Sequence, residues 1–179
     1  MLQLFAFSKV GVAVADLYFV DPNPAPGQEG AERGVRLEVR LVERREHDGS
    51  VYASRPILVG RPIWRADLLE TVAGPAGSFD RTHHHPRMRG WEPGSRQFDP
   101  APSADPLGWV GARLSDLDGL LAAAGVDPGD VDPTDADDLR RAAPDIVAAT
   151  RRLLDAVHAG ELAREPAGAV GNSVRQSWL

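Results

Sequence analysis

The first third of the chain alternates apolar and polar residues in the way that predicts β-strands. Residues 2–7 and 10–20 are rich in β-branched and aromatic side chains, and we predict a strand in each. The clearest strand has apolar residues on one face and charged residues on the other: Val35, Leu37, Val39 and Leu41 against Arg36, Glu38 and Arg40. This pattern predicts one buried face and one face in water.

A β-hairpin is predicted directly after that strand. Asp48-Gly49 supplies the positive φ angles that a two-residue turn requires, and this turn would place Val39 opposite Leu58. Pro56 and Pro62 then place the returning strand at a sheet edge or end it in a bulge.

Residues 63–72 are open to two interpretations. The spacing of their apolar residues fits a short helix, and the alternation from residue 64 to residue 68 fits a strand equally well. We favour the helix, because Gly74 would then end it in the left-handed conformation.

Residues 74–109 show no sustained period and are interrupted by six prolines. A loop of this length is uncommon in a compact domain unless it binds something or is disordered. Disordered segments are poor in large apolar side chains, whereas this one holds several aromatic residues. We therefore predict a long ordered loop that packs on the sheet.

The C-terminal third is predicted to be helical. Ser115 is placed to cap a helix over residues 116–124, and Asp132-Pro133 is placed to begin another. An apolar stripe predicts a helix over residues 144–159, with Gly160 behind it.

Strands followed by helices are the order of an α+β domain, here an N-terminal antiparallel sheet with C-terminal helices packed on it. A chain of 179 residues with 42% apolar content suits one core, so we expect a single domain over residues 1–179. We expect this domain to be mostly β over residues 1–73, to carry the site on a loop over 74–111, to be helical over 112–160 and to end in a tail over 161–179. The tail closes on Trp178-Leu179, which predicts either docking on the body or on a second copy in a homodimer, or a frayed end.

Composition excludes several kinds of partner and site. A net charge of -6 argues against binding to nucleic acid or to an anionic membrane surface. The absence of cysteine excludes disulfides and thiolate metal sites. The first 16 residues lack a basic leader, and no apolar run is long enough to span a membrane, so we expect a cytoplasmic protein.

The sharpest candidate for chemistry is His83-x-His85 within the long loop. In an extended backbone, residues two apart point to the same side, so these imidazoles can converge on one metal ion. A third ligand is then needed, and we favour Asp80 or Glu92. The other groups available as a third ligand are Asp67, Glu70, His47 and His158. Without thiolates the ion would be zinc, iron, manganese or copper.

The stretch from Gly77 through five residues to His83-x-His85 resembles the opening of the first motif of the cupins, a family of metal-binding β-barrels. This resemblance implies an alternative fold, a small cupin-like β-barrel with a helical C-terminus. The chain departs from the family pattern after the histidines. Arg89 and Gly90 stand where a cupin has its glutamate, and no second motif supplies a third histidine.

A second interpretation of the same stretch is anion capture. Arg81, Arg87 and Arg89 bracket the histidines, Trp91 follows them, and guanidinium groups hold carboxylate or phosphate in two-point geometry. Paired histidines would then exchange protons near neutral pH.

Motifs for nucleotide cofactors, serine hydrolases and helical zinc proteases are absent from the sequence. We therefore favour a metal-binding protein, and within that class a small hydrolytic or oxidative enzyme acting on a small acidic or aromatic molecule. The alternative is a non-enzymatic module that associates with itself or a partner, whose Arg/His/Trp loop binds an anion or another protein.

Overall fold

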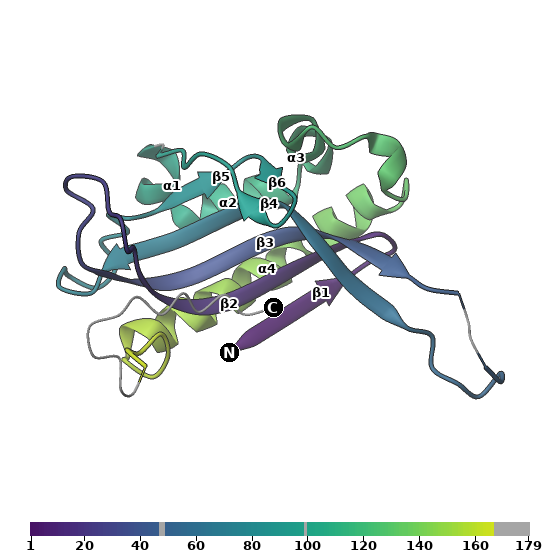
Figure 1. Cartoon of the computed structure of the whole chain (residues 1–179), viewed down its shortest axis with the longest axis horizontal. Coiled ribbons are helices and arrows are strands. Elements are labelled where there is room, and N and C mark those ends of the chain that lie inside the picture. The colour runs from purple at the N-terminus through teal and green to yellow at the C-terminus, as the bar shows by residue number, and fades with distance from the viewer. Residues whose placement is uncertain (47–48, 99, 167–179) are drawn as a thin grey trace.

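The computed structural model describes residues 1–46, 49–98 and 100–166, and its centre is a five-stranded antiparallel sheet (Figure 1). The strands are β1 (Leu2–Ala6), β2 (Val10–Val20), β3 (Ala31–Arg44), β4 (Ile57–Thr71) and β5 (His83–His85). Each strand pairs with the next one in the chain, in the order β1-β2-β3-β4-β5. The sheet is not closed into a barrel, so the cupin-like alternative is wrong.

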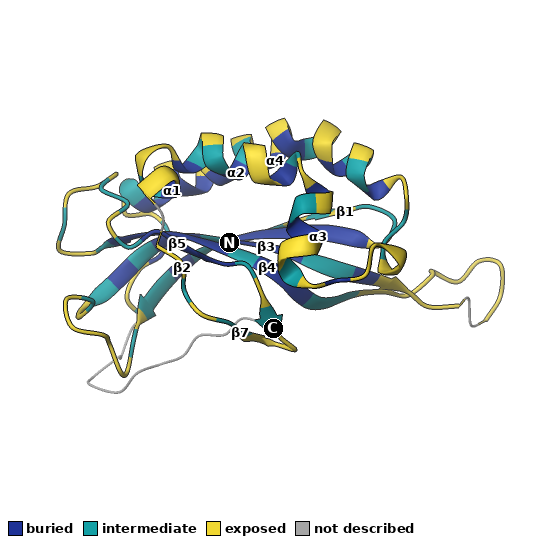
Figure 2. Ribbon diagram, turned by 90° about the horizontal axis from the view of Figure 1, so that it is seen from above, coloured by how far each residue is buried: buried dark blue, intermediate teal, exposed yellow. Residues whose placement is uncertain are grey.

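The helices lie on one face of this sheet, as Figure 2 shows. They are α1 (Pro100–Ala104), α2 (Pro106–Leu114), α3 (Leu117–Ala124), the short 3-10 helix η1 (Pro128–Asp130) and α4 (Asp135–His158). A small two-stranded sheet, β6 (Met88–Arg89) with β7 (Glu92–Pro93), lies toward the opposite face. The α+β class with C-terminal helices on the sheet is confirmed. In the described part of the chain, no helix combines the length and apolar character needed to cross a membrane.

The core forms between the apolar face of the sheet and the helices. Val35, Leu37 and Val39 are fully buried there, as their alternation predicted. Removing such side chains from water stabilises the fold by about 1.5–3 kcal/mol each. The other face of β3 is not in water, however, because Glu38 is only 3% exposed. The expectation of a wet face was therefore wrong, and the charged residues on it are part of a covered polar surface.

Residues 63–71 belong to β4, so the favoured helix was wrong. This strand pairs with β3 on one side and with β5 on the other. Trp64, Ala66 and Leu68 face the core at the spacing of a strand. Pairing along two neighbours decides the structure where local spacing is ambiguous, because propensity is weaker than tertiary context.

The connection between β3 and β4 is longer than predicted. Val39 pairs with Trp64 rather than with Leu58, and residues 45–56 join the strands at the end of an arm that projects from the sheet (Figure 1). Residues 47–48 lie outside the described residues, so the two-residue turn predicted at Asp48-Gly49 stays a prediction. Pro62 stands opposite Arg40 where the register shifts, which confirms the predicted bulge.

The loop over residues 74–109 is ordered in its described residues, as predicted, and contains β5, β6, β7, α1 and the start of α2.

In the helical third, Asp116 caps α3 instead of Ser115, by accepting from the backbone N–H of Gly119 at 3.0 Å. Helix α4 begins at Asp135 and runs through Pro144, so it is nine residues longer at its start than the stripe predicted. The end of the tail, residues 167–179, lies outside the described residues.

Gly34 is required where β3 passes closest to β4, and its replacement is the first testable change. A Cβ at this position would stand 2.0 Å from the carbonyl oxygen of Leu68. We expect Gly34→Ala to lower the free energy of unfolding by about 2–4 kcal/mol, measured by urea denaturation. The control is Gly111→Ala in α2, whose Cβ would meet only Val147 at 3.5 Å. Equal midpoints for the two variants would contradict this packing.

Candidate metal centre

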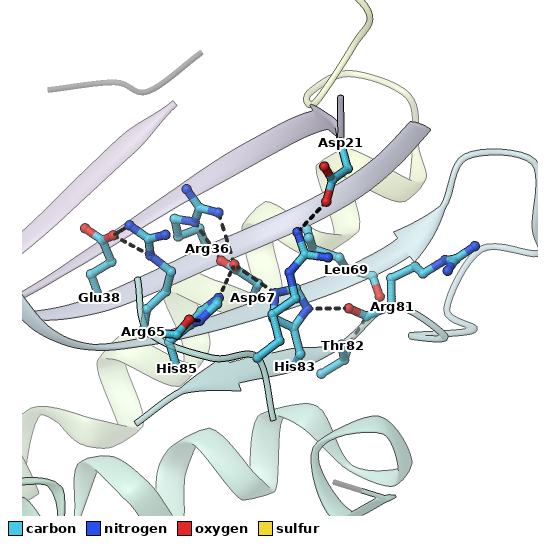
Figure 3. A network of polar contacts seen from close by, with 12 residues as sticks. Asp21, Arg36, Glu38, Arg65, Asp67, Leu69, Arg81, Thr82, His83 and His85 are labelled. Carbon is cyan, nitrogen blue, oxygen red and sulfur yellow. Dashed lines mark hydrogen bonds and ion pairs between the residues drawn. The ribbon is translucent and has the colours of Figure 1, made fainter. Parts of the chain in front are cut away.

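Strand register gathers the polar side chains on the face away from the helices. In the β4–β5 pair, His83 stands opposite Asp67 and His85 stands opposite Arg65. In the β3–β4 pair, Arg36 stands opposite Asp67. Directly opposed residues of antiparallel strands point to the same face, so these side chains form one cluster (Figure 3).

His84 points to the other face, as its position between the two histidines predicts. Its ring lies 5.2 Å from that of Trp109 and 6.4 Å from that of Trp64, within the core. Of the three consecutive histidines, His84 therefore packs in the core, and His83 and His85 belong to the polar cluster.

The ligand atoms of Asp67, His83 and His85 converge. Oδ2 of Asp67 lies 3.4 Å from Nε2 of His83 and 3.8 Å from Nε2 of His85. The three ligand atoms all lie within 4.8 Å of one another. Ligands of a tetrahedral zinc ion, bound at about 2.0–2.1 Å, are roughly 3.3 Å apart. The group therefore could hold a metal ion, with only small adjustments of its side chains.

Backbone carbonyls orient both imidazoles. Nδ1 of His83 lies 2.8 Å from the carbonyl oxygen of Arg81, and Nδ1 of His85 lies 2.9 Å from that of Gly94. A carbonyl can only accept, so each Nδ1 carries a hydrogen, and Nε2 of a neutral ring is then an acceptor. This is the arrangement by which proteins orient metal-binding histidines.

His85 is neutral at physiological pH. Burial lowers the pKa of its imidazole from 6.5 to about 4, although the charge of Asp67 acts in the opposite direction. The lone pair on Nε2 of His85 therefore faces a carboxylate oxygen of Asp67, and neither atom carries a hydrogen that could bond to the other. A cation at the centre of the group satisfies both atoms.

Asp67 is held as a carboxylate by Arg36. Nε of Arg36 donates to Oδ1 at 2.6 Å, and Nη2 donates to Oδ2 at 3.0 Å. Burial alone would raise the pKa of Asp67, but the charge of Arg36 and the hydrogen bonds that Arg36 donates outweigh it and hold that pKa well below its usual range. The side chain is 2% exposed, so Asp67 is a buried, ionised carboxylate.

A cavity of about 380 Å³ opens onto this group. Its size falls at the lower end of small-molecule sites. One part of its lining is apolar and the other is polar or charged: Leu17, Phe19, Pro22, Leu69, Trp91 and Pro93 beside Asp21, Asn23, Arg36, Arg65, Asp67, His83, His85, Glu92 and Arg96.

The structure brings His83 and His85 together as predicted, but it joins them to Asp67 rather than to the favoured third ligands. Asp80 accepts hydrogen bonds from Thr71 and Ser78 and thereby closes a turn. Glu92 lines the cavity and is not a member of the convergent group.

Glu70 and His158, two further candidates for the third ligand, lie elsewhere. Glu70 accepts from the backbone N–H of Gly77 at 2.6 Å and lies 3.4 Å from Nε2 of His158. Glu70 is therefore engaged with α4, away from the histidines of β5. His47 lies outside the described residues.

The arginines predicted to bind an anion are placed away from the cavity. Nη1 of Arg81 donates to the carbonyl oxygen of Gly27 at 2.6 Å, and Nε of Arg87 donates to that of Ala123 at 2.8 Å. Arg89 is exposed on β6. Trp91 does line the cavity, with the guanidinium of Arg40 5.3 Å from its ring centroid.

Three other arginines line the cavity, namely Arg36, Arg65 and Arg96. The alternation of charged residues on β3 was the signal for Arg36, although it was interpreted as a solvated face. Arg65 and Asp67 alternate in the same way on β4 and were hidden by the helical interpretation of that segment.

Comparisons with protein-family models, with curated proteins and with solved structures found no match to this chain. Its function is therefore argued from the chemistry of the site.

The protonation of His85 is directly measurable. In metal-free protein, we expect nitrogen NMR to show His85 neutral and protonated on Nδ1 from about pH 7 down to about pH 5, assigned with a His85→Gln variant. Because the unfolded chain binds this proton near pH 6.5 and the folded chain does so only near pH 4, stability falls as the pH drops between these values. An imidazolium signal from His85 at about pH 6 would contradict the burial of this ring.

Proposed function

We propose that Asp67, His83 and His85 bind one divalent metal ion, and that the protein is a small metal-dependent enzyme. The observation that carries this proposal is the convergence of three acceptor atoms in a buried site. Two of these atoms are imidazole nitrogens whose opposite nitrogens are fixed by backbone carbonyls. A bound cation would stabilise such a group, whereas packing alone would leave its buried acceptor atoms without a partner.

Three protein ligands leave coordination positions open for water, oxygen or substrate. Catalytic zinc sites have this form, and two histidines with one carboxylate also suit non-haem iron(II). Bound zinc or manganese would activate water for hydrolysis, and iron(II) or copper would support oxidation. The open positions would face the cavity that His83, His85 and Asp67 line, and the apolar side chains and arginines of its lining would suit a small acidic or aromatic molecule.

Acid–base catalysis without a metal is less well supported. A general base works best with a pKa near the operating pH, whereas burial lowers the pKa of His85 to about 4. The same low pKa favours metal binding, because protons then compete weakly for Nε2.

The partner-binding alternative also has less support. It needs Arg81 and Arg87 as groups that receive an anion, and both side chains donate to backbone carbonyls instead. The metal-dependent enzyme is therefore the function that the site supports best.

Metal titration of untagged protein tests the proposal. We expect about one metal ion per chain in the parent, by elemental analysis after reconstitution with zinc, manganese or iron(II). His85→Gln removes one of the three ligands and should weaken affinity by at least about 100-fold, because losing even an outer partner of a ligand weakens it 10- to 100-fold.

The matched control is His158→Gln, a histidine on α4 whose side chain is 26% exposed and which lies outside the convergent group. This variant should keep the metal content of the parent. Equal metal content in the two variants, or no metal in the parent after reconstitution, would refute the proposal.

A further inference from the structure

Metal binding would leave the cavity with an uncompensated positive charge. Six ionised side chains line it in addition to the two histidines: Arg36, Arg65, Arg96, Asp21, Asp67 and Glu92. Three positive and three negative groups cancel, and Glu38 behind Arg65 is balanced by Arg40, so a divalent ion would bring the site to about two positive charges. A low-dielectric cavity with this charge favours an anionic ligand.

Arg65 is the guanidinium best placed to contact such an anion beside the metal. It stands directly opposite His85 in the β4–β5 register, so its side chain rises next to a metal ligand (Figure 3). Arg36 also lies beside the group, but its Nε and Nη2 hold Asp67, a member of the group itself, whereas the carboxylate that holds Arg65 belongs to Glu38, outside the group. Arg96 is occupied by Asp21 and Gln28, at 2.9 and 3.1 Å.

Glu38 fixes Arg65 by one edge only. Nε and Nη2 of Arg65 both approach Oε1 of Glu38, at 2.7 and 2.6 Å. The side chain of Arg65 lines the cavity. Its bonds to Glu38 use Nε and Nη2, and Nη1 has no hydrogen-bond partner among the described residues. The guanidinium is thus held rigidly with donors available toward the cavity, as a pre-organised binding group requires.

The other part of the lining is apolar and suits the body of an organic ligand. Leu17, Phe19 and Leu69 project from β2 and β4 on the same face as Asp67. A carboxylate has two oxygens, so one can coordinate a metal while the other accepts from a guanidinium.

We propose that the cavity takes a small carboxylic acid, whose carboxylate bridges the metal and Arg65 and whose apolar body lies against Phe19 and Leu69. This inference rests on the metal-dependent function proposed above and assigns its substrate class. It makes Arg65 a residue that determines specificity, in contrast to the metal ligands.

Calorimetric titration with benzoate and with benzamide, its neutral counterpart of similar shape, tests the proposal on zinc-loaded protein. We expect benzoate to bind at least about tenfold more tightly than benzamide in the parent. In Arg65→Gln this preference should fall by at least about threefold, because the charge of Arg65 is lost while the metal keeps part of the preference for the anion.

The matched control is Arg140→Gln on α4, which removes the same charge from an exposed side chain paired with Asp137. It should keep the preference for benzoate. Arg65→Lys keeps the charge but loses the fork and should give an intermediate preference. If the thermal melt shows that Arg65→Gln does not fold, the preference for benzoate over benzamide is compared between the parent and Arg65→Lys instead. A lower preference in Arg65→Lys supports the proposal, and an equal one contradicts it.

Zinc binding is measured separately, in the absence of benzoate, so the two proposals fail in different ways. Zinc binding with equal affinity for benzoate and benzamide, or with an unchanged preference in Arg65→Gln, overturns the carboxylic acid proposal and leaves the metal site standing. A preference that depends on Arg65 in protein that binds no zinc supports the Arg65 site and overturns the metal.

Discussion

The fork between Arg36 and Asp67 is the interaction on which the polar face of the sheet depends. An ionised carboxylate that is 2% exposed would be unstable without a partner, and two short hydrogen bonds from one guanidinium supply it. Removing one member of a buried pair of this kind typically lowers stability by about 3–5 kcal/mol. With Asp67 fixed, the β4–β5 register places His83 directly across from it and His85 two residues further along.

The same sheet supports packing on one face and chemistry on the other. Ala66 and His84 are paired neighbours that point into the core, while Asp67 and His83 are paired neighbours that point into the cavity. A shift of one residue in the β4–β5 register would turn His83 and His85 against the helices and His84 into the cavity. The core contacts of Trp64 and Trp109 around His84 therefore stabilise the site indirectly, because they specify the register.

The local features of the fold could be predicted from the sequence, and the pairing that forms the site could not. Alternation predicted β1, β2 and the middle of β3, and the two histidines at spacing two were found for the correct reason. Asp67 was only one of several candidates for the third ligand, because residues 63–72 fit a helix as well as a strand. Asp80 and Glu92, the favoured ligands, lie close to the histidines in the chain, whereas Asp67 reaches them through strand pairing across a connection of eleven residues, from 72 to 82.

The most direct test of the account is a crystal structure of the protein grown with manganese, with diffraction data that locate the ion by its anomalous scattering. We expect one peak about 2.0–2.3 Å from Nε2 of His83, Nε2 of His85 and a carboxylate oxygen of Asp67. Absence of a peak between these three side chains at saturating manganese, zinc and iron(II), with the histidines in the orientation described, would contradict the metal centre.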